Sequence, residues 1–143
     1  HVGSTSIPNL DSKAIIDIDI IYENELEFEK IKSGLIKIGY YHNGNQGIEK
    51  REVFKRTRES SHGALDIITH HLYVCIKNCE PLQRHILMRD FLRKNDWARL
   101  KYQEMKYELA EKANQNKKLY DGLKELNVNE FIDEIIEKEK RNV

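Results

Sequence analysis

The chain has 143 residues, and its 24 basic and 24 acidic side chains give a formal net charge of zero at pH 7. This length is typical of one domain with a single core, and the balanced charge argues against a protein that coats nucleic acid. The content of Ile, Leu, Val and aromatic residues argues against disorder. No apolar run approaches membrane-spanning length. We therefore expect neither nucleic acid as the main ligand nor a membrane partner.

The two cysteines, Cys75 and Cys79, are too few for a disulfide framework. A Cys-x-x-x-Cys pair without a second pair is also a poor zinc signature. Cys75 lies in a predicted strand, where it is expected to be a small core residue. A reducing, cytoplasmic setting is the simplest interpretation.

The first segment combines a glycine turn with a strand that carries two carboxylates. Residues 3–13 are predicted to be a loop with a short helical turn after Pro8. Residues 14–22 are predicted to form a buried strand, in which Asp17 and Asp19 point to one face. The opposite face of the strand is apolar and carries Ile16, Ile18, Ile20 and Tyr22.

Two carboxylates in an otherwise apolar strand are costly to bury unless a cation compensates them. A divalent metal ion or a cluster of Arg and Lys would do so. Upstream, Gly3-Ser4 is a small turn rich in hydrogen-bond donors, which suits an anion. A phosphate loop beside paired carboxylates is the arrangement of a site for a metal-bound nucleotide. The alternative is a structural cluster of salt bridges around Asp17 and Asp19.

The order of the following elements predicts an α/β (α+β) fold. A helix from about Asn24 to Lys37, capped by Asn24, is followed by strands at Tyr40, 51–56 and 65–77. Strands in such succession after one helix indicate a small mixed, mostly antiparallel sheet. After Pro81 the pattern is helical, with a break at Asn95-Asp96 and a last helix capped by Asn129. We therefore expect a single domain over 1–143, with a sheet part at 1–80 and a helical layer at 81–143.

Basic side chains suggest where a phosphate would bind. Arg51 and Lys55 fall on one face of their strand and are candidate phosphate ligands; solvated charge on a strand edge is the alternative. Arg89 and Arg93 share one face of a helix and would form a second phosphate clamp. The alternative for Arg89 is packing of its stem together with an ion pair to Asp90.

A third metal ligand would come from later in the chain. His71 shares the polar face of its strand with Tyr73 and Cys75, so it could face the carboxylates or be a structural histidine. Asp66 is a further candidate, but it precedes the regular alternation and its direction is not predicted. Imidazole with carboxylates would also suit Mn²⁺ or Zn²⁺.

Several motifs as a set closely resemble the GrpB family, and the match runs through nearly the whole chain. They are His1-Val2-Gly3-Ser4-Thr5-Ser6-Ile7-Pro8-Asn9-Leu10, Lys13-Ala14-Ile15-Ile16-Asp17-Ile18, Arg51-x-x-Phe54-Lys55, Thr69-His70-His71-Leu72-Tyr73-Val74, Arg89-Asp90-Phe91-Leu92-Arg93, Tyr102-x-x-x-Lys106 and Tyr120-x-x-x-Lys124. Two departures are visible: Asn9 replaces the usual Gly, and Ala14 the usual Pro.

The resemblance implies a nucleotidyltransferase-like fold and a helix before His1. It implies that Gly3, Ser4 and Thr5 hold nucleotide phosphates, and that Asp17 and Asp19 are catalytic and bind Mg²⁺ or Mn²⁺. The third carboxylate usual in that superfamily would here be replaced by His71 or supplied by Asp66. The expected activity is metal-dependent transfer of a nucleotidyl or phosphoryl group to an unknown small-molecule acceptor. The alternative is a non-catalytic module that binds a nucleotide or metabolite.

Overall fold

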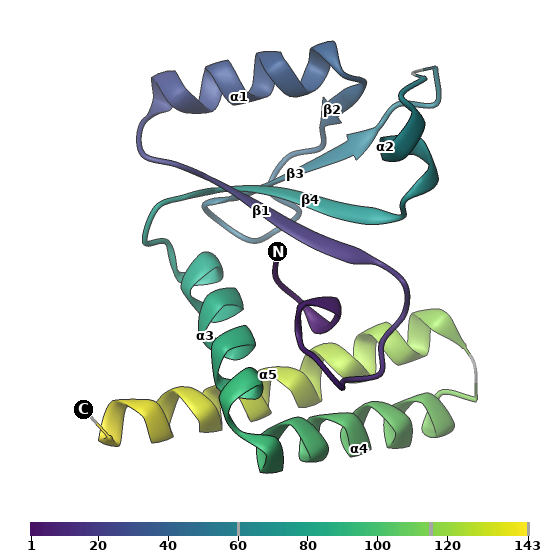
Figure 1. Ribbon diagram of the computed structural model, residues 1–143, viewed down its shortest axis with the longest axis vertical. Helices are drawn as coiled ribbons and strands as arrows, with labels where there is room; N and C mark the ends of the chain where they lie inside the picture. Colours follow the sequence, from purple (N-terminus) through teal and green to yellow (C-terminus); the bar gives the residue numbers. More distant parts are fainter. Residues whose placement is uncertain (60, 115, 143) are drawn as a thin grey trace. The chain divides into compact units, whose positions relative to one another are not determined.

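The computed structural model describes residues 1–59, 61–114 and 116–142 (Figure 1). The chain divides into two compact units. The first contains His1–Ser6 and Ser12–Ile86, and the second contains Ile7–Asp11 and the chain from Leu87 onward. The first unit holds the predicted sheet and the second holds most of the C-terminal helices, so the expected mixed α/β fold is confirmed.

Four strands form one sheet in the order β1-β4-β3-β2. They are β1 (Ile16–Tyr22), β2 (Tyr40–His42), β3 (Arg51–Arg56) and β4 (His70–Ile76). β1 and β4 are parallel, whereas the other two pairs are antiparallel, as the mixed, mostly antiparallel prediction requires. The register sets Asp17 opposite His71 and Asp19 opposite Tyr73. The inner position of β4 therefore brings its polar side chains next to the two carboxylates.

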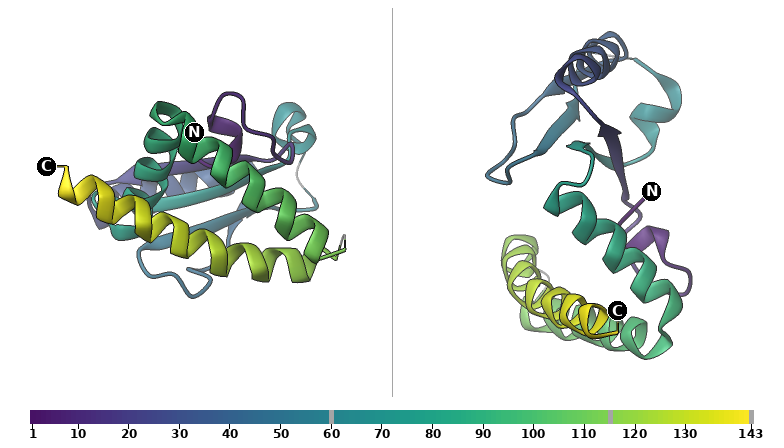
Figure 2. Two further views of the ribbon diagram at one scale, coloured as in Figure 1. Left: turned by 90° about the horizontal axis from the view of Figure 1, so that it is seen from below. Right: turned by 90° about the vertical axis from the view of Figure 1, so that its left-hand side faces the viewer.

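Helix α1 (Glu25–Lys37) covers one side of this sheet (Figures 1 and 2). Its predicted N-cap is confirmed, because the Asn24 side chain accepts a hydrogen bond from the Glu27 N–H at 3.0 Å. Side chains from α1 and all four strands form the core on this side: Tyr22, Phe28, Leu35, Tyr40, Phe54, Leu72 and Val74. Because strand side chains alternate, Asp17 and Asp19 must point to the other side.

The other side of the sheet meets the start of helix α3 (Glu80–Lys94). Cys75, Cys79 and Leu82 form a small buried cluster, against which Tyr73 and Ile86 pack. Both cysteines are free, and Cys75 is fully buried as predicted. This cluster fixes the first turns of α3 against β4.

Helices α4 (Asp96–Lys112) and α5 (Lys117–Arg141) complete the second unit. The break at Asn95 is confirmed. Their shared core comprises Ile7, Leu10, Phe91, Leu92, Ala98, Tyr102, Phe131 and Ile135. In the described part of the chain, no helix is both long and apolar enough to cross a membrane.

Three local predictions were wrong. Residues 65–77 are not one strand, because helix α2 (Gly63–Ile67) precedes β4 and contributes Leu65 to the core under α1. The N-terminal helical turn is η1 (Ser4–Ser6), which lies before Pro8. Asn129 does not cap a last helix, because α5 runs through it. Its exposed side chain carries only a small cost in helix propensity, which the buried Phe131 and Ile135 outweigh.

The N-terminal segment lies against the free edge of β1. The Val2 N–H donates to the Asp17 carbonyl at 2.9 Å, and these two residues form an isolated antiparallel bridge. Gly3 has a φ of +73°, and a Cβ there would overlap the Asp17 carboxylate. The Ser6 hydroxyl donates to the Gly3 carbonyl at 2.6 Å. Glycine is therefore required at position 3 for packing alone, whatever ligand binds nearby.

We expect Gly3→Ala to lower the free energy of unfolding by about 1–3 kcal/mol, because it combines an unfavourable φ with a clash against Asp17. Denaturant unfolding measures the change.

The matched control is Gly34→Ala. Gly34 lies inside α1 with open space where a Cβ would be, so alanine there should raise stability by about 0.5–1 kcal/mol. Equal effects at the two positions would contradict the close approach of Gly3 to Asp17.

Candidate functional site

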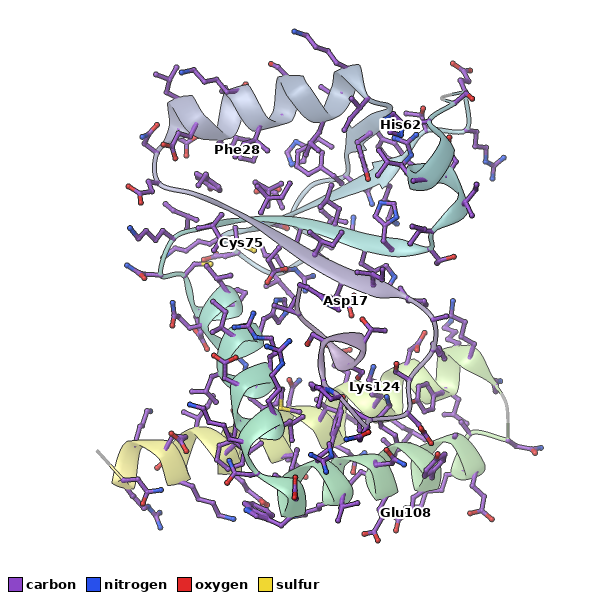
Figure 3. The ribbon with its side chains drawn as sticks, viewed as in Figure 1. Asp17, Phe28, His62, Cys75, Glu108 and Lys124 are labelled. Atoms are coloured by element: carbon purple, nitrogen blue, oxygen red, sulfur yellow. The ribbon has the colours of Figure 1, made fainter. Side chains whose placement is uncertain are left out.

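Five of the predicted site residues lie on the side of the sheet opposite α1. Asp17 and Asp19 come from β1, His71 from β4, and Arg51 and Lys55 from β3. Figure 3 shows the two sides, with Phe28 between α1 and the sheet and Asp17 on the opposite side. The alternation of three neighbouring strands thus places carboxylates, an imidazole and cationic side chains on one surface.

Asp17 is held from two directions. Its Oδ1 lies 2.9 Å from His71 Nδ1, and Gly3 packs against the same carboxylate. The Asp17 side chain is 27 % exposed and that of His71 is 54 % exposed. The prediction that His71 could face the carboxylates therefore agrees with this geometry, in which water still reaches the pair.

Asp19 is nearly dry, with a side chain that is only 3 % exposed. Its Oδ2 lies 2.7 Å from Nδ1 of His85, which extends from α3. Its Oδ1 is buried and has no hydrogen-bond partner among the residues that the structure describes. His85 is not among the site residues predicted from the sequence. The sequence does indicate that His85 shares a helix face with Leu82, because the two are three residues apart. It does not indicate which strand that face packs against.

Tyr73 lies between the two histidines. Its ring centroid is 6.3 Å from that of His71 and 6.0 Å from that of His85. Burial raises the pKa of the Tyr73 hydroxyl, and the charge of Asp17 raises it further, whereas Arg51 lowers it. The Arg51 Cζ lies 4.6 Å above the Tyr73 ring in a cation–π contact. The Tyr73 phenol therefore stays neutral at physiological pH.

The guanidinium group of Arg51 is only partly satisfied by its surroundings on this surface. Its Nε is buried without a hydrogen-bond partner in the described part of the chain. A buried guanidinium donor that is not paired loses its hydration without compensation, so it favours an anion that would accept its N–H.

A cavity of about 550 Å³ lies beside this surface. Its lining residues come mainly from β3, from β4 and from the segment 65–69 between them. Four of its lining residues come from the polar surface: Arg51, Lys55, His71 and Tyr73. A volume of this order is typical of small-molecule sites.

Asp66 also lines this cavity, but its carboxylate is already bound. Its Oδ1 accepts from Arg56 Nε at 2.9 Å and Nη2 at 2.7 Å, and its Oδ2 accepts from the His62 N–H. The His62 N–H and the Arg56 guanidinium hold the pKa of Asp66 below its usual value. Asp66 thus has the contacts of a structural partner for Arg56. Within 1–59, 61–114 and 116–142, no three His, Cys, Asp or Glu side chains form a cluster that could hold a metal.

The remaining predicted residues occupy two places. Ser4 and Thr5 are in η1, directly after Gly3, and the Thr5 hydroxyl lies 2.8 Å from His1 Nε2. Arg89 belongs to the second unit, where its Nε donates to Asp90 at 2.8 Å and lowers the pKa of that carboxyl. This ion pair with Asp90 was predicted from the sequence as the alternative to phosphate binding by Arg89.

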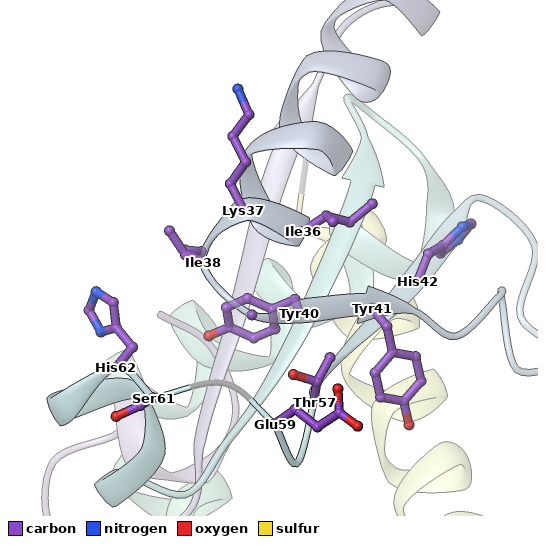
Figure 4. Close-up of a pocket in the computed structure, with 11 residues that line it drawn as sticks. Ile36, Lys37, Ile38, Tyr40, Tyr41, His42, Thr57, Glu59, Ser61 and His62 are labelled. Carbon is purple, nitrogen blue, oxygen red and sulfur yellow. The ribbon is translucent and has the colours of Figure 1, made fainter.

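A second cavity of about 660 Å³ lies elsewhere in the first unit (Figure 4). It is lined by the C-terminal end of α1, by β2 and by residues that follow β3, among them Lys37, Tyr41, Glu59 and His62. None of the predicted site residues lines it. The candidate site is therefore the polar sheet surface with the smaller cavity.

Comparisons with known proteins agree with the resemblance noted above. The family described as "GrpB protein" matches residues 1–138. The "Glutamate-rich protein GrpB" of Alkalihalophilus pseudofirmus is 32% identical over 135 residues, which cover 94% of this chain and 74% of that protein. The UPF0157 protein YqkA of Bacillus subtilis is 31% identical over 110 residues, which cover 77% of this chain but only 30% of YqkA.

A solved structure extends the agreement to three dimensions. The crystal structure of the conserved protein GrpB from Enterococcus faecalis superimposes with a TM-score of 0.74 at 27% identity, and it covers 96% of this chain and 79% of that one. The family match and the shared fold lead to one conclusion: the chain belongs to the GrpB family.

Proposed function

We propose that the polar sheet surface binds a divalent cation together with a phosphate-bearing ligand, and that the protein transfers a nucleotidyl or phosphoryl group to a small-molecule acceptor. One observation carries the proposal. Asp19 Oδ1 and Arg51 Nε are both buried without partners in the described residues, and they do not pair with each other. A metal–phosphate ligand is complementary to both, because it offers a cation to the carboxylate and an anion to the guanidinium.

The donor set fits Mg²⁺ or Mn²⁺. Asp17 and Asp19 supply oxygen ligands, and Mg²⁺ commonly uses one or two carboxylates while phosphates and water complete its shell. A bound divalent ion of this kind polarises phosphoryl oxygens and offsets their charge. A site to which the described residues contribute two carboxylates and no third ligand is therefore compatible with a metal that arrives with its nucleotide.

The cationic side chains would act on the phosphates. Arg51 presents a planar donor fork above Tyr73, and Lys55 adds a flexible ammonium group at the same cavity. Both would neutralise charge as the acceptor oxygen bonds to phosphorus and the bond to the leaving phosphate breaks, with the acceptor proton passing to water. Gly3 packs against Asp17, and Ser4 and Thr5 follow it in η1; these three residues would contact the phosphates from the other end.

A non-catalytic nucleotide- or metabolite-binding module is the second candidate. Two observations favour it. Asp17 and Asp19 each already contact a histidine, and Asp66 is already bound to Arg56. Ligand binding without turnover would identify this second function.

We expect a panel of ribonucleoside triphosphates with Mg²⁺ to contain a ligand that raises the melting temperature of the protein, because binding only to the folded state stabilises it. At a ligand concentration of 100 times the Kd, the free energy of unfolding increases by about 2.7 kcal/mol. Asp17→Asn and Asp19→Asn should remove the Mg²⁺-dependent part of the shift.

Asp121→Asn is the matched control, since Asp121 is an exposed carboxylate in α5. A nucleotide-induced shift that is the same in all three variants would contradict the assignment of Asp17 and Asp19.

We expect Arg51→Gln to weaken nucleotide binding by about 10- to 100-fold in calorimetry, because a charge-assisted hydrogen bond to phosphate contributes about 1.5–3 kcal/mol. Binding of Mn²⁺ alone should be nearly unchanged. Arg58→Gln removes the same charge from an exposed turn and should leave the nucleotide affinity unaltered. Equal losses in the two variants would indicate a general charge effect in place of a phosphate contact.

A further inference from the structure

His85 contacts this surface, and the proposed function gives it no role. It lies in the second turn of α3, and its side chain is 30 % exposed while the Asp19 carboxylate beneath it is 3 % exposed. Its Nδ1 is 2.7 Å from Asp19 Oδ2. When the carboxylate is ionised it can only accept, and the donor of this hydrogen bond is then the Nδ1–H of His85.

The orientation of His85 is determined by packing. Leu82 is 2 % exposed in the cluster with Cys75 and Cys79, and Ile86 packs against the same cluster. Residues three and four apart share a helix face, so His85 must also face the sheet. The Tyr73 ring contacts the imidazole from the side of β4. These contacts leave the imidazole little freedom to leave Asp19.

The hydrogen bond gives the two Asp19 oxygens different environments. Oδ2 is bound by His85, which fixes the rotation of the carboxylate. Oδ1 is then left buried and unpartnered in the described residues. Histidine–carboxylate contacts that orient a ligand oxygen are a general feature of metal sites, and their loss commonly lowers metal affinity by about 10- to 100-fold.

We infer that His85 is a positioning residue, whose Nδ1–H holds Asp19 Oδ2 so that Oδ1 is presented to the divalent cation. This inference rests on the proposed function, since it concerns the same cation. It makes the two carboxylates unequal. Asp19 is the rigid, dry ligand, whereas the Asp17–His71 pair is open to water and is correspondingly weaker.

The test is the affinity of the protein for Mn²⁺ alone, measured from the electron paramagnetic resonance signal of free Mn²⁺ during a titration. We expect His85→Ala to weaken Mn²⁺ binding by about 10- to 100-fold. His85→Asn should recover the affinity to within about fivefold of the original, because the Asn side-chain amide places an N–H where Nδ1–H was. A role in packing alone predicts no such recovery.

Two further variants separate positioning from folding. Leu82→Ala should destabilise the attachment of α3 without removing the donor, so its Mn²⁺ affinity should stay within about threefold of the original wherever circular dichroism shows it folded. His71→Ala should weaken Mn²⁺ binding less than His85→Ala does, because its hydrogen bond with Asp17 competes with water.

The outcomes distinguish the two proposals. If Asp19→Asn abolishes Mn²⁺ binding while His85→Ala binds like the unmodified protein, the positioning role is overturned and the proposed function stands. If His85→Ala and Leu82→Ala weaken binding equally and Asn gives no recovery, His85 acts only in packing. If the unmodified protein binds no Mn²⁺ alone, the positioning role is overturned, and the shift in melting temperature with nucleotide and Mg²⁺ decides the proposed function separately.

Discussion

The burial of Asp19 is the constraint around which the first unit is built. β1 must place Ile18, Ile20 and Tyr22 under α1, and the alternation of a strand then forces two carboxylates to the other side. One of them is almost completely removed from water. An uncompensated charge in such a position costs several kcal/mol, so the surrounding structure has to supply partners. His85 on α3 is the partner that the fold provides.

The two sides of the sheet consequently have opposite characters. The side under α1 is a continuous apolar core, and its aromatic rings contact one another, as Phe28 does with Tyr22 and Phe54. The other side carries Asp17, Asp19, His71 and Arg51 around a single tyrosine ring. Much of the charge there is partnered, but one buried carboxylate oxygen and one buried guanidinium nitrogen have no partner among the residues that the structure describes. A buried carboxylate oxygen and a buried guanidinium N–H without partners are costly for stability, and a ligand that carries both charges would offset that cost.

Gly3 has a packing role that does not depend on any ligand. The sequence predicts the glycine turn and the two carboxylates as separate parts of a site, one for phosphate and one for metal. In the structure the turn is packed directly onto Asp17, and the chain before it is bonded to the Asp17 backbone. The requirement for glycine at this position follows from that contact without any ligand. Phosphate binding by Ser4 and Thr5 stays a prediction.

Much of the first unit could be predicted because its signals are local. Strand alternation is a two-residue period, so the faces of Asp17, Asp19, Arg51 and Lys55 follow from the sequence directly. The cap of α1 at Asn24 and the break at Asn95 are equally local. The motif set identified the family, which the comparisons confirm.

Tertiary structure decided the partners of these residues. The contact between Asp19 and His85 joins positions 66 residues apart, and it depends on which strand the Leu82 face of α3 packs against. Asp66 pairs with Arg56 because α2 interrupts the segment that the sequence had assigned to a strand. Periodicity determines which way a side chain points along its own element. The partner of that side chain is determined by the packing of elements that are distant in the sequence. That packing places His85 beside Asp19.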